Sequence, residues 1–381
     1  MLDLKRHRSE TAMFVAFLTL ISMVSTISGA ASALLGDINV DGSVDVRDLS
    51  IVTHAVDSHP GDESWNPFAD LNNDKVINIV DIATVAKHFG ESAQQPPDQP
   101  PENGLTVGVD LWCGTTQSTF LDKSRLPLMQ QCGIQMVRLE FNRDSVANLR
   151  RLVPTTVNNG IEVLGLLMRK DLNNSIDAWG GWVYSVVSEF KDYVHVWECW
   201  NEPNLDEFFS GADPVVYTSF LKSGYNEAKR ADPTCVVLGG SIVFTQRSSL
   251  DFLTAMYESG AKDYMDALSY HPYCTPYSPI NNNTFNAYSR LETRVRPIMV
   301  QNGDENKKIW ITEMGWGTED VTEDQQATYL TQALAMAQNW GWVETFIIYK
   351  WIDSGDCYKG LLSEDGSPKP SFYAVKDFIN G

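Results

Sequence analysis

Short runs rich in β-branched and aromatic residues alternate with amphipathic helical stretches from residue 104 to residue 381. Strands that alternate with helices form a parallel sheet, because each crossover helix carries the chain back to the end of the sheet where the previous strand began. Eight such runs can be counted, and eight βα units in about 280 residues match a (β/α)8 TIM barrel in number and size. The expected strands are residues 105–112, 136–141, 161–168, 194–200, 235–243, 265–273, 308–314 and 345–351.

A doubly wound open sheet is the alternative fold for the same alternation. Its dinucleotide-binding form carries a glycine-rich G-x-G-x-x-G turn after an early strand, and no early strand expected here is followed by one. The α/β barrel is therefore the preferred fold class. Barrels place their chemistry at the carboxyl ends of the strands, so the side chains at these ends are the candidates for a functional site.

Two glutamates lie at the ends of expected strands and would therefore share one rim. Glu202 follows the fourth strand in the sequence W-N-E-P, and Glu313 lies near the end of the seventh in I-T-E. Two such carboxylates can hydrolyse a glycosidic bond with retention, because one protonates the leaving oxygen while the other attacks the anomeric carbon. Solvated surface glutamates are the simpler interpretation. Polar and aromatic partners on the other strand ends disfavour it.

These motifs resemble those of clan A, the barrel clan of retaining β-glycosidases. The stretches WNEPN, ADPTCVVLGGSI, DALSYHPY, ITEMGWGT and GLLSEDGSPKPSFYAV are most similar to family 39 and its relatives, and the likeness covers residues 105–379. That family includes β-xylosidases and exopolysaccharide-cleaving endoglycosidases. The resemblance therefore implies a glycoside hydrolase that acts on a polysaccharide, either plant cell-wall glucan or xylan or a microbial exopolysaccharide.

The resemblance also implies a role for each matching residue. Glu202 would be the acid/base, Glu313 the nucleophile and Asn201 the ligand of the sugar 2-hydroxyl. Three residues would orient the nucleophile: Arg138, His271 and Tyr273. Trp351 would stack on the sugar, and Trp316 is a further substrate-binding candidate. The tryptophans could equally be core residues, although flat aromatic rings suit the apolar faces of sugars. No cofactor is expected for hydrolysis itself.

Two other function classes compete with this hypothesis. A non-catalytic carbohydrate-binding or adhesive protein would keep the tryptophans but would not need both glutamates. A metal-dependent hydrolase is disfavoured, because the six histidines include no H-x-H or H-E-x-x-H spacing. A nucleic-acid partner is disfavoured by the formal net charge of −20, since phosphates repel an acidic surface.

Two acidic segments repeat one pattern near the amino terminus: DINVDGSVDVRD over residues 37–48 and DLNNDKVINIVD over residues 70–81. Oxygen side chains recur at loop positions 1, 3, 5, 9 and 12 of both copies, and a backbone carbonyl at position 7 completes the shell that Ca2+ requires. Acidic helix caps are the alternative, but they do not explain five matches in each copy. The predicted ligands of two structural calcium sites are Asp37, Asn39, Asp41, Ser43, Asp45 and Asp48, and Asp70, Asn72, Asp74, Val76, Asn78 and Asp81.

The duplicated loop and helix over residues 34–92 resemble the type I dockerin family, which binds cohesin modules. A cohesin domain of a scaffold or cell-surface protein is therefore the implied partner. Lys75 replaces the turn glycine that Gly42 supplies in the first loop. We expect weaker calcium binding at the second loop, because a left-handed conformation costs a non-glycine residue roughly 1 kcal/mol or more. The family's recognition positions hold Val46, Arg47, Ile79 and Val80.

The remaining segments suggest export and a modular chain. Residues 1–33 have basic residues followed by an apolar run and small residues ending at Ala33, which is typical of a secretory signal peptide, with an uncleaved anchor as the alternative. Residues 93–103, AQQPPDQPPEN, are typical of an extended linker. The predicted segments are thus 1–33, 34–92, 93–103 and 104–381, in a secreted, extracellular protein without membrane attachment after signal cleavage.

All six cysteines follow residue 110 and none has the C-x-x-C spacing of a zinc site. In an exported chain up to three disulfides are possible, and their pairing is not evident from the sequence. Cys199 alternates into a predicted core strand, so we expect it to be a buried free thiol.

Overall fold

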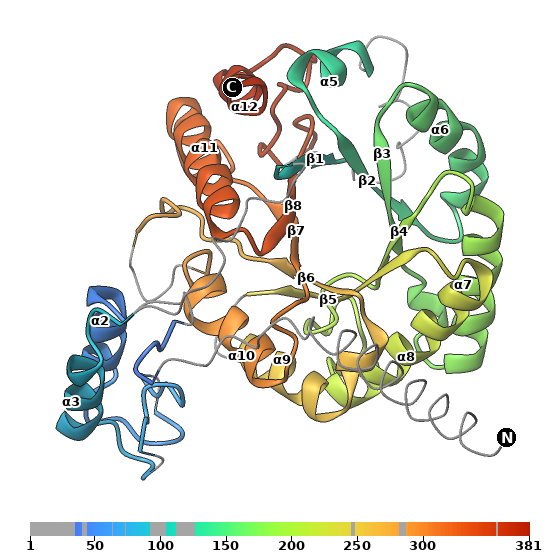
Figure 1. Cartoon of the computed structure of the whole chain (residues 1–381). Helices are drawn as coiled ribbons and strands as arrows, with labels where there is room; N and C mark the ends of the chain where they lie inside the picture. Colours follow the sequence, from blue (N-terminus) through green and yellow to red (C-terminus); the bar gives the residue numbers. More distant parts are fainter. Residues whose placement is uncertain are drawn as a thin grey trace, which may run out of the picture. The chain divides into compact units, whose positions relative to one another are not determined.

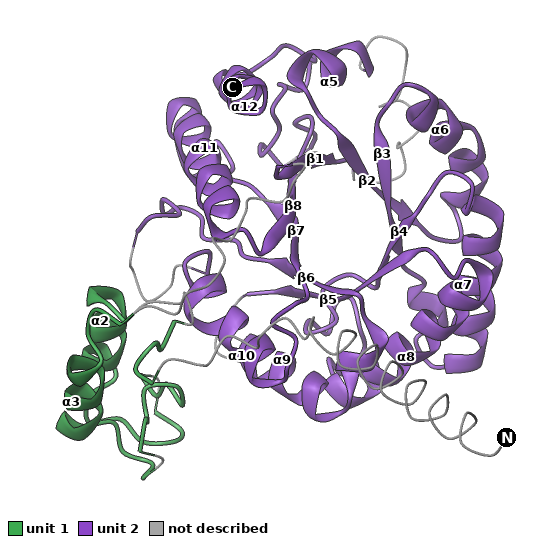
Figure 2. Cartoon of the chain, in the orientation of Figure 1, with its two compact units in different colours: residues 1–96 green, residues 97–381 purple. Residues whose placement is uncertain are grey.

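The computed structural model of the chain describes residues 35–39, 44–62, 64–72, 74–91, 104–111, 126–244, 248–281, 287–355 and 357–381. The predicted signal peptide and linker lie outside these residues, as do Asp41, Ser43 and Cys113. The chain divides into two compact units, residues 1–96 and residues 97–381, which Figure 2 colours separately. None of the helices in the described ranges has the length and apolarity needed to cross a membrane.

The smaller unit contains two short helices, α2 (Val46–His54) and α3 (Ile79–Lys87), and each begins where one of the acidic repeats ends. A capping box opens each helix: the side chain of Asp45 or Asn78 caps the first turn, and the last aspartate of the repeat bonds back to the cap residue. The helices share a small core of Ile38, Val44, Val52, Ala55, Ala69, Ile77 and Val85. The repeat seen in the sequence is therefore also a structural repeat.

Lys75 adopts the left-handed conformation that its place in the second loop predicts, with φ of 68°. Its amide donates to Asp70 Oδ2 at 2.9 Å, and the amide of Asp74 donates to Asp70 Oδ1 at 3.1 Å. The loop thus wraps its backbone around the first carboxylate of the repeat even without a glycine at the turn.

The larger unit is a closed barrel of eight parallel strands in sequence order, with β1 pairing β8 (Figure 1). The predicted TIM barrel is confirmed, and each expected strand overlaps an observed one. The strands are β1 (Thr106–Asp110), β2 (Met136–Phe141), β3 (Glu162–Leu167), β4 (Val196–Cys199), β5 (Val236–Val243), β6 (Ala267–His271), β7 (Ile309–Met314) and β8 (Val343–Ile348).

Helices follow the strands and form a ring outside them in Figure 1. They are α5 (Leu126–Cys132), α6 (Val146–Asn158), α7 (Ile176–Phe190), α8 (Pro214–Ala231), α9 (Ser248–Glu258), α10 (Arg296–Gln301), α11 (Glu323–Trp340) and α12 (Pro370–Asn380). Short turns of 3-10 helix cover Lys170–Leu172 and Ala261–Tyr264, and a π-helical turn covers Leu291–Val295. Among the described cysteines all are free thiols, and Cys199 is buried, as predicted.

The polarity of the barrel strands changes along their length. A buried apolar cluster joins six of them through Met136, Leu164, Leu238, Ala267, Trp310 and Ile347. Toward the carboxyl ends, buried polar residues replace these side chains: Asp110, Arg138, Glu198, His271, Thr312 and Glu313. Because parallel strands end on one rim, this change of polarity concentrates the buried charges of the barrel at its carboxyl end.

Gly165 in β3 is required by the packing of an aromatic side chain. A Cβ atom there would lie 2.5 Å from Trp197 Cε3 and Cζ3. The Trp197 indole has little room to move away, because it packs edge-on against the Phe141 ring at a centroid distance of 5.0 Å. The barrel therefore needs glycine at this position for steric reasons.

We expect Gly165→Ala to lower the free energy of unfolding by about 1–3 kcal/mol, because overpacking forces side chains off their rotamers. Gly181→Ala is the matched control: this glycine is exposed in α7 and a Cβ there has no atom within 4 Å, so helix propensity should raise stability by roughly 0.5–1 kcal/mol. Urea unfolding followed by tryptophan fluorescence measures both, and a Gly165→Ala protein as stable as wild type would contradict the packing argument.

Candidate active site

Arg138 of β2 is the centre of the polar rim. Its Nε donates to Glu198 Oε2 at 2.7 Å, and its Nη2 donates to Asn201 Oδ1 at 2.8 Å. Its Nη1 donates to both Asp110 Oδ2 at 2.8 Å and Glu313 Oε1 at 2.5 Å. One guanidinium with 2% of its surface exposed therefore connects β1, β2, β4, β7 and the loop after β4.

The electrostatics of this cluster keep the guanidinium charged. Burial alone would lower the pKa of Arg138, but the negative charges of Glu198, Glu313 and Asp110 outweigh it and raise the pKa well above its usual value. Three carboxylates surround a single cation, so the cluster carries excess negative charge. This excess negative charge raises the pKa of any further carboxyl group nearby.

Glu313 is held as a carboxylate. Its Oε1 accepts from Arg138 and its Oε2 accepts from the Tyr273 hydroxyl at 2.8 Å. Burial would raise the pKa of Glu313, but the charges of His271 and Arg138 and the hydrogen bonds from Tyr273 and Arg138 hold it below its ordinary value. The group is thus ionised and oriented at both oxygens.

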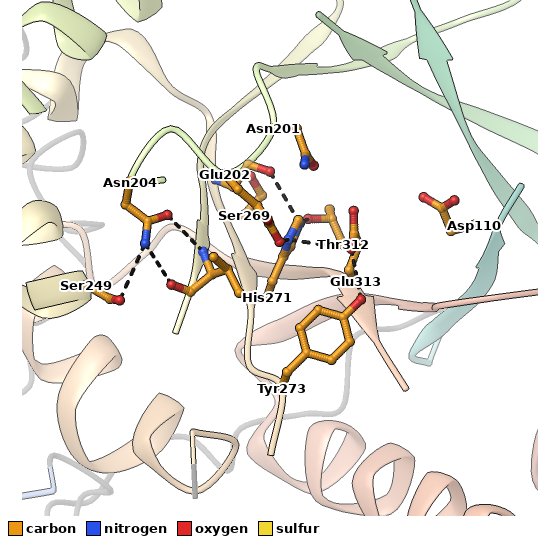
Figure 3. A network of polar contacts seen from close by, with 12 residues as sticks. Asp110, Asn201, Glu202, Asn204, Ser249, Ser269, His271, Tyr273, Thr312 and Glu313 are labelled. Atoms are coloured by element: carbon orange, nitrogen blue, oxygen red, sulfur yellow. Dashed lines mark hydrogen bonds and ion pairs between the residues drawn. The ribbon is translucent and has the colours of Figure 1, made fainter. Parts of the chain in front are cut away.

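Glu202 lies just after β4 on a backbone in the left-handed region, with φ of 43°. Its amide donates to the carbonyl of Ser241, itself at φ of 47°, with an N···O distance of 3.0 Å. Asn204 then exchanges hydrogen bonds with the backbone of Val243 at 3.1 Å and 2.8 Å (Figure 3). Non-glycine residues keep such conformations where the surroundings over-determine them, which is common at functional sites.

The pKa of Glu202 shifts in the opposite direction to that of Glu313. Its Oε1 lies 2.9 Å from His271 Nδ1. Burial raises the pKa of Glu202 above its ordinary value, and Glu313 raises it further, against the lowering effects of His271 and Arg138. Burial would lower the pKa of His271, but Glu313 and Glu202 together raise it. The two glutamates therefore have opposite tendencies at one rim.

The carboxylates open into a cavity of about 340 Å³ that Arg138, Asn201 and Tyr273 also line. One oxygen of Glu202 and one oxygen of Glu313 lie within 4.8 Å of each other. The other walls are mostly apolar and aromatic, with one acidic and one basic residue: Leu166, Met168, Phe208, Tyr349, Glu140 and Lys170. The cavity has the mixture of apolar surface and a few convergent polar groups that small-molecule sites have.

The same pair of glutamates and His271 could be taken for a metal site, because one ligand atom from each lies within 4.8 Å of the others. The charge distribution argues for a different role. Glu313 already receives the Arg138 guanidinium at 2.5 Å, and His271 Nδ1 lies within hydrogen-bond distance of Glu202. The ligand atoms that a metal would need are therefore already engaged by groups of the protein.

The structure brings six of the residues singled out in the sequence into one site: Arg138, Asn201, Glu202, His271, Tyr273 and Glu313. His271 forms its hydrogen bond with Glu202, and it lies 3.8 Å from Glu313. Trp316 and Trp351 are fully buried and do not line the cavity. Trp316 donates to the carbonyl of Tyr277, while Trp351 packs against Phe372.

Sequence reasoning missed several residues of the site, among them Asp110, Glu198, Thr312 and Tyr349. A signal existed for two of them. Asp110 and Glu198 are charged residues inside otherwise apolar expected strands, and a charge at such a position must find a partner. No comparable signal identifies Thr312 or Tyr349.

Two family models match the chain. The model described as dockerin type I domain matches residues 35–95. The model described as glycosyl hydrolase catalytic core matches residues 176–374, which is more than half of the chain. A search of curated proteins found no match.

Solved structures with the same barrel fold are similar over about three quarters of this chain. A family 39 glycoside hydrolase from Bacteroides cellulosilyticus has a TM-score of 0.59 at 20% identity, covering 76% of this chain and 66% of its own. A monomeric beta-xylosidase from Caulobacter crescentus has a TM-score of 0.58 at 17% identity, and the match covers 73% of this chain and 68% of the xylosidase chain. The family 39 enzyme from Xanthomonas axonopodis pv. citri has a TM-score of 0.57 at 18% identity, and the match covers 73% of this chain and 66% of that enzyme. The chain thus spans about two thirds of each neighbour's length.

We expect Arg138→Met to lower the free energy of unfolding of the barrel by about 3–5 kcal/mol at neutral pH, because it leaves buried carboxylates without their cation. The pKa values of those carboxylates in the folded variant then rise above their unfolded values. The folded state binds more protons, so the stability of the variant falls as pH rises.

Urea unfolding at pH 5 and pH 7 measures this effect. The matched control is Arg150→Met, which removes an ion pair with Glu189 at the surface and should leave stability unchanged, since exposed pairs contribute little. An Arg138→Met protein with the stability of wild type at both pH values would contradict the account.

Proposed function

We propose, from the premise that the chain belongs to the glycosyl hydrolase catalytic core family, that it hydrolyses a β-linked polysaccharide with retention of configuration. The observation that carries the proposal is the pair of glutamates, because one oxygen of Glu202 lies within 4.8 Å of one oxygen of Glu313. Retaining enzymes place their carboxyl groups about 5 to 5.5 Å apart, whereas inverting enzymes need about 6.5 to 9.5 Å to seat a water molecule.

Glu313 is the proposed nucleophile and Glu202 the proposed acid/base. In the first step Glu313 attacks the anomeric carbon while Glu202 gives its proton to the departing glycosidic oxygen. In the second step a water molecule loses its proton to Glu202 and displaces Glu313 from the sugar. The lowered pKa of Glu313 and the raised pKa of Glu202 suit these roles, because the nucleophile must be ionised and the acid protonated at the start.

Asn201 is the proposed ligand of the sugar 2-hydroxyl. Its Oδ1 already accepts from Arg138, so its NH2 group is the part left to donate. Asn201 lines the cavity beside both glutamates. A hydrogen bond to the 2-hydroxyl strengthens as charge develops on the sugar ring in the transition state.

The cavity walls suit the rest of a sugar chain. The rings of Phe208 and Tyr349 provide flat surfaces for the apolar faces of sugars. Glu140 and Lys170 supply polar groups for hydroxyls. We propose plant cell-wall glucan or xylan, or a microbial exopolysaccharide, as the substrate class.

The smaller unit is the proposed calcium-dependent docking module, as its match to the dockerin type I domain suggests. Asp81 is fully buried, and its described partners are the neutral backbone amides of Leu71 and Asn78. A buried carboxylate of this kind fits a nearby cation. Asp70, Asn72, Asp74, Asn78 and the carbonyl of Val76 would complete one site, and the first repeat would form the second.

A cohesin domain is the proposed partner, and export through the amino-terminal signal is the proposed route to it. Val46, Ile79 and Val80 expose 65%, 71% and 50% of their surface. Apolar side chains at the start of α2 and α3 offer a docking surface of the kind that protein interfaces bury. The enzyme would then act outside the cell, within a scaffold or cell-surface complex.

Three variants test the catalytic roles. Glu313→Gln should abolish hydrolysis. Glu202→Ala should slow cleavage of unactivated polysaccharide by about 10²–10⁴-fold. It should spare kcat/KM for 2,4-dinitrophenyl β-glycosides, whose leaving group needs no proton, and it should lower their kcat, which azide restores by replacing water in the second step. Glu189→Gln, at an exposed glutamate on α7, should behave as wild type. Undiminished polysaccharide hydrolysis by either Glu313→Gln or Glu202→Ala would refute the role assigned to that residue.

Chelation tests the calcium proposal in the full chain. EDTA should lower the melting temperature of the smaller unit, because bound calcium stabilises only the folded loops, and it should leave the barrel transition unchanged. Differential scanning calorimetry resolves the two transitions, and excess calcium should reverse the effect. An EDTA-treated chain in which both transitions stay where they were would rule the proposal out.

A further inference from the structure

A chain of buried hydrogen bonds runs from Glu198 to the proposed acid/base. The Thr312 hydroxyl donates to Glu198 Oε1 at 2.7 Å, and Thr312 Oγ1 lies 3.1 Å from His271 Nε2. His271 Nδ1 lies 2.9 Å from Glu202 Oε1. Glu198, Thr312 and His271 are fully buried, so water cannot substitute for any partner in the chain.

The protons in this chain can be assigned by counting donors. Glu198 accepts from Arg138 Nε at its second oxygen and from Thr312 at its first, so both of its oxygens act as acceptors. The single hydroxyl proton of Thr312 is then committed to Glu198. Two lone pairs facing each other at 3.1 Å would repel, so His271 Nε2 must carry the hydrogen that Thr312 accepts.

Ser241 is compatible with this assignment. Its Oγ lies 3.3 Å from the same nitrogen of His271, and its hydroxyl can rotate to accept. The charged groups that face His271 are Glu202, Glu313 at 3.8 Å and, farther away, Arg138. None of them contacts Nε2. The tautomer is therefore set by the hydrogen bond between Nε2 and Thr312, whose hydroxyl is oriented by Glu198.

We propose that Glu198 and Thr312 are positioning residues that hold the proton of neutral His271 on Nε2 and thereby reserve Nδ1 for the proton of Glu202. This inference rests on the acid/base role proposed for Glu202. With Nε2 protonated, Glu202 Oε1 and His271 Nδ1 share one further proton across 2.9 Å. While that proton is on Glu202, His271 is neutral and accepts through Nδ1, and when it moves to Nδ1, His271 becomes the cation that lowers the pKa of Glu313. With the opposite tautomer, Nδ1–H would stabilise the Glu202 carboxylate and withdraw the acid from the reaction.

The same carboxylate also supports the nucleophile. Glu198 Oε2 accepts from Arg138, and Arg138 bonds Glu313. Glu198 therefore orients the nucleophile through a guanidinium and the acid/base through a hydroxyl and an imidazole. This double connection gives a physical reason for a buried charge in β4.

The most specific variant is Thr312→Val, which removes the hydroxyl and keeps the shape of the side chain. Neutral His271 can then move its proton to Nδ1 and donate to Glu202. The pKa of Glu202 falls, so the alkaline limb of the kcat/KM profile moves to lower pH, by roughly half a unit to one unit. Thr312→Ser keeps a hydroxyl and should restore the wild-type limb.

The matched control is Thr156→Val, which removes a buried hydroxyl that donates to the carbonyl of Leu152 within α6. It should leave the pH profile unchanged. Profiles are measured by release of reducing sugar from the polysaccharide that wild type cleaves fastest among glucans, xylans and mannans. An alkaline limb that stays in place in Thr312→Val overturns the inference.

A second readout needs no substrate. The chain has six histidines, so ¹⁵N NMR of histidine-labelled full-length protein can assign the His271 signals through their loss in His271→Gln. At a pH where the ring is neutral, wild type should show the Nε2–H tautomer and Thr312→Val a mixture or the Nδ1–H form. Nδ1–H in wild type would overturn the inference.

The two proposals can fail separately. If Glu202→Ala cleaves unactivated polysaccharide as fast as wild type, the acid/base role of Glu202 is wrong, whatever the tautomer of His271. If Glu202→Ala behaves as expected and the Thr312→Val profile matches wild type, only the positioning role of Glu198 and Thr312 is wrong.

Discussion

The buried guanidinium of Arg138 is the interaction on which the rest of the site depends. It hydrogen bonds three carboxylates and one amide that come from separate parts of the barrel. Such a cluster is poor evidence for stability, because well-packed apolar residues often stabilise a core as much as buried ion pairs do. Its contribution is geometric: one guanidinium orients groups from β1, β4 and β7, and Glu313 still lines the cavity.

Different hydrogen-bond partners shift the pKa values of two chemically identical groups in opposite directions. Glu313 has the cation and a tyrosine hydroxyl against its oxygens, whereas Glu202 has only an imidazole that can accept as well as donate. Burial raises the proton affinity of both carboxylates, and their partners decide which one loses its proton. A single rim can therefore present the proposed nucleophile and the proposed acid at the same pH.

The hydrophobic pattern was enough to predict the barrel, because each strand has a local signature and parallel order follows from the intervening helices. The rule that barrel chemistry lies at strand ends identified Glu202 and Glu313, but the details of their surroundings depend on contacts that sequence spacing does not encode. His271 could face either glutamate, and in the structure its Nδ1 bonds Glu202 and lies 3.8 Å from Glu313. Trp351 comes after β8, yet its ring packs under α12 against Phe372, while Tyr349 reaches the cavity. Glu198 in β4 and Thr312 in β7 are close enough to hydrogen bond only because the barrel is closed.

The stereochemistry of the first-formed product tests the central claim most directly. Proton NMR of the reaction in progress, on a β-linked oligosaccharide that the wild-type chain cleaves, distinguishes the two anomers of the newly released reducing end before they equilibrate. If Glu313 attacks the anomeric carbon directly, the β-anomer should appear first and the α-anomer should grow only by mutarotation. An α-anomer formed first would mean inversion, and the assignment of Glu313 as nucleophile would be wrong.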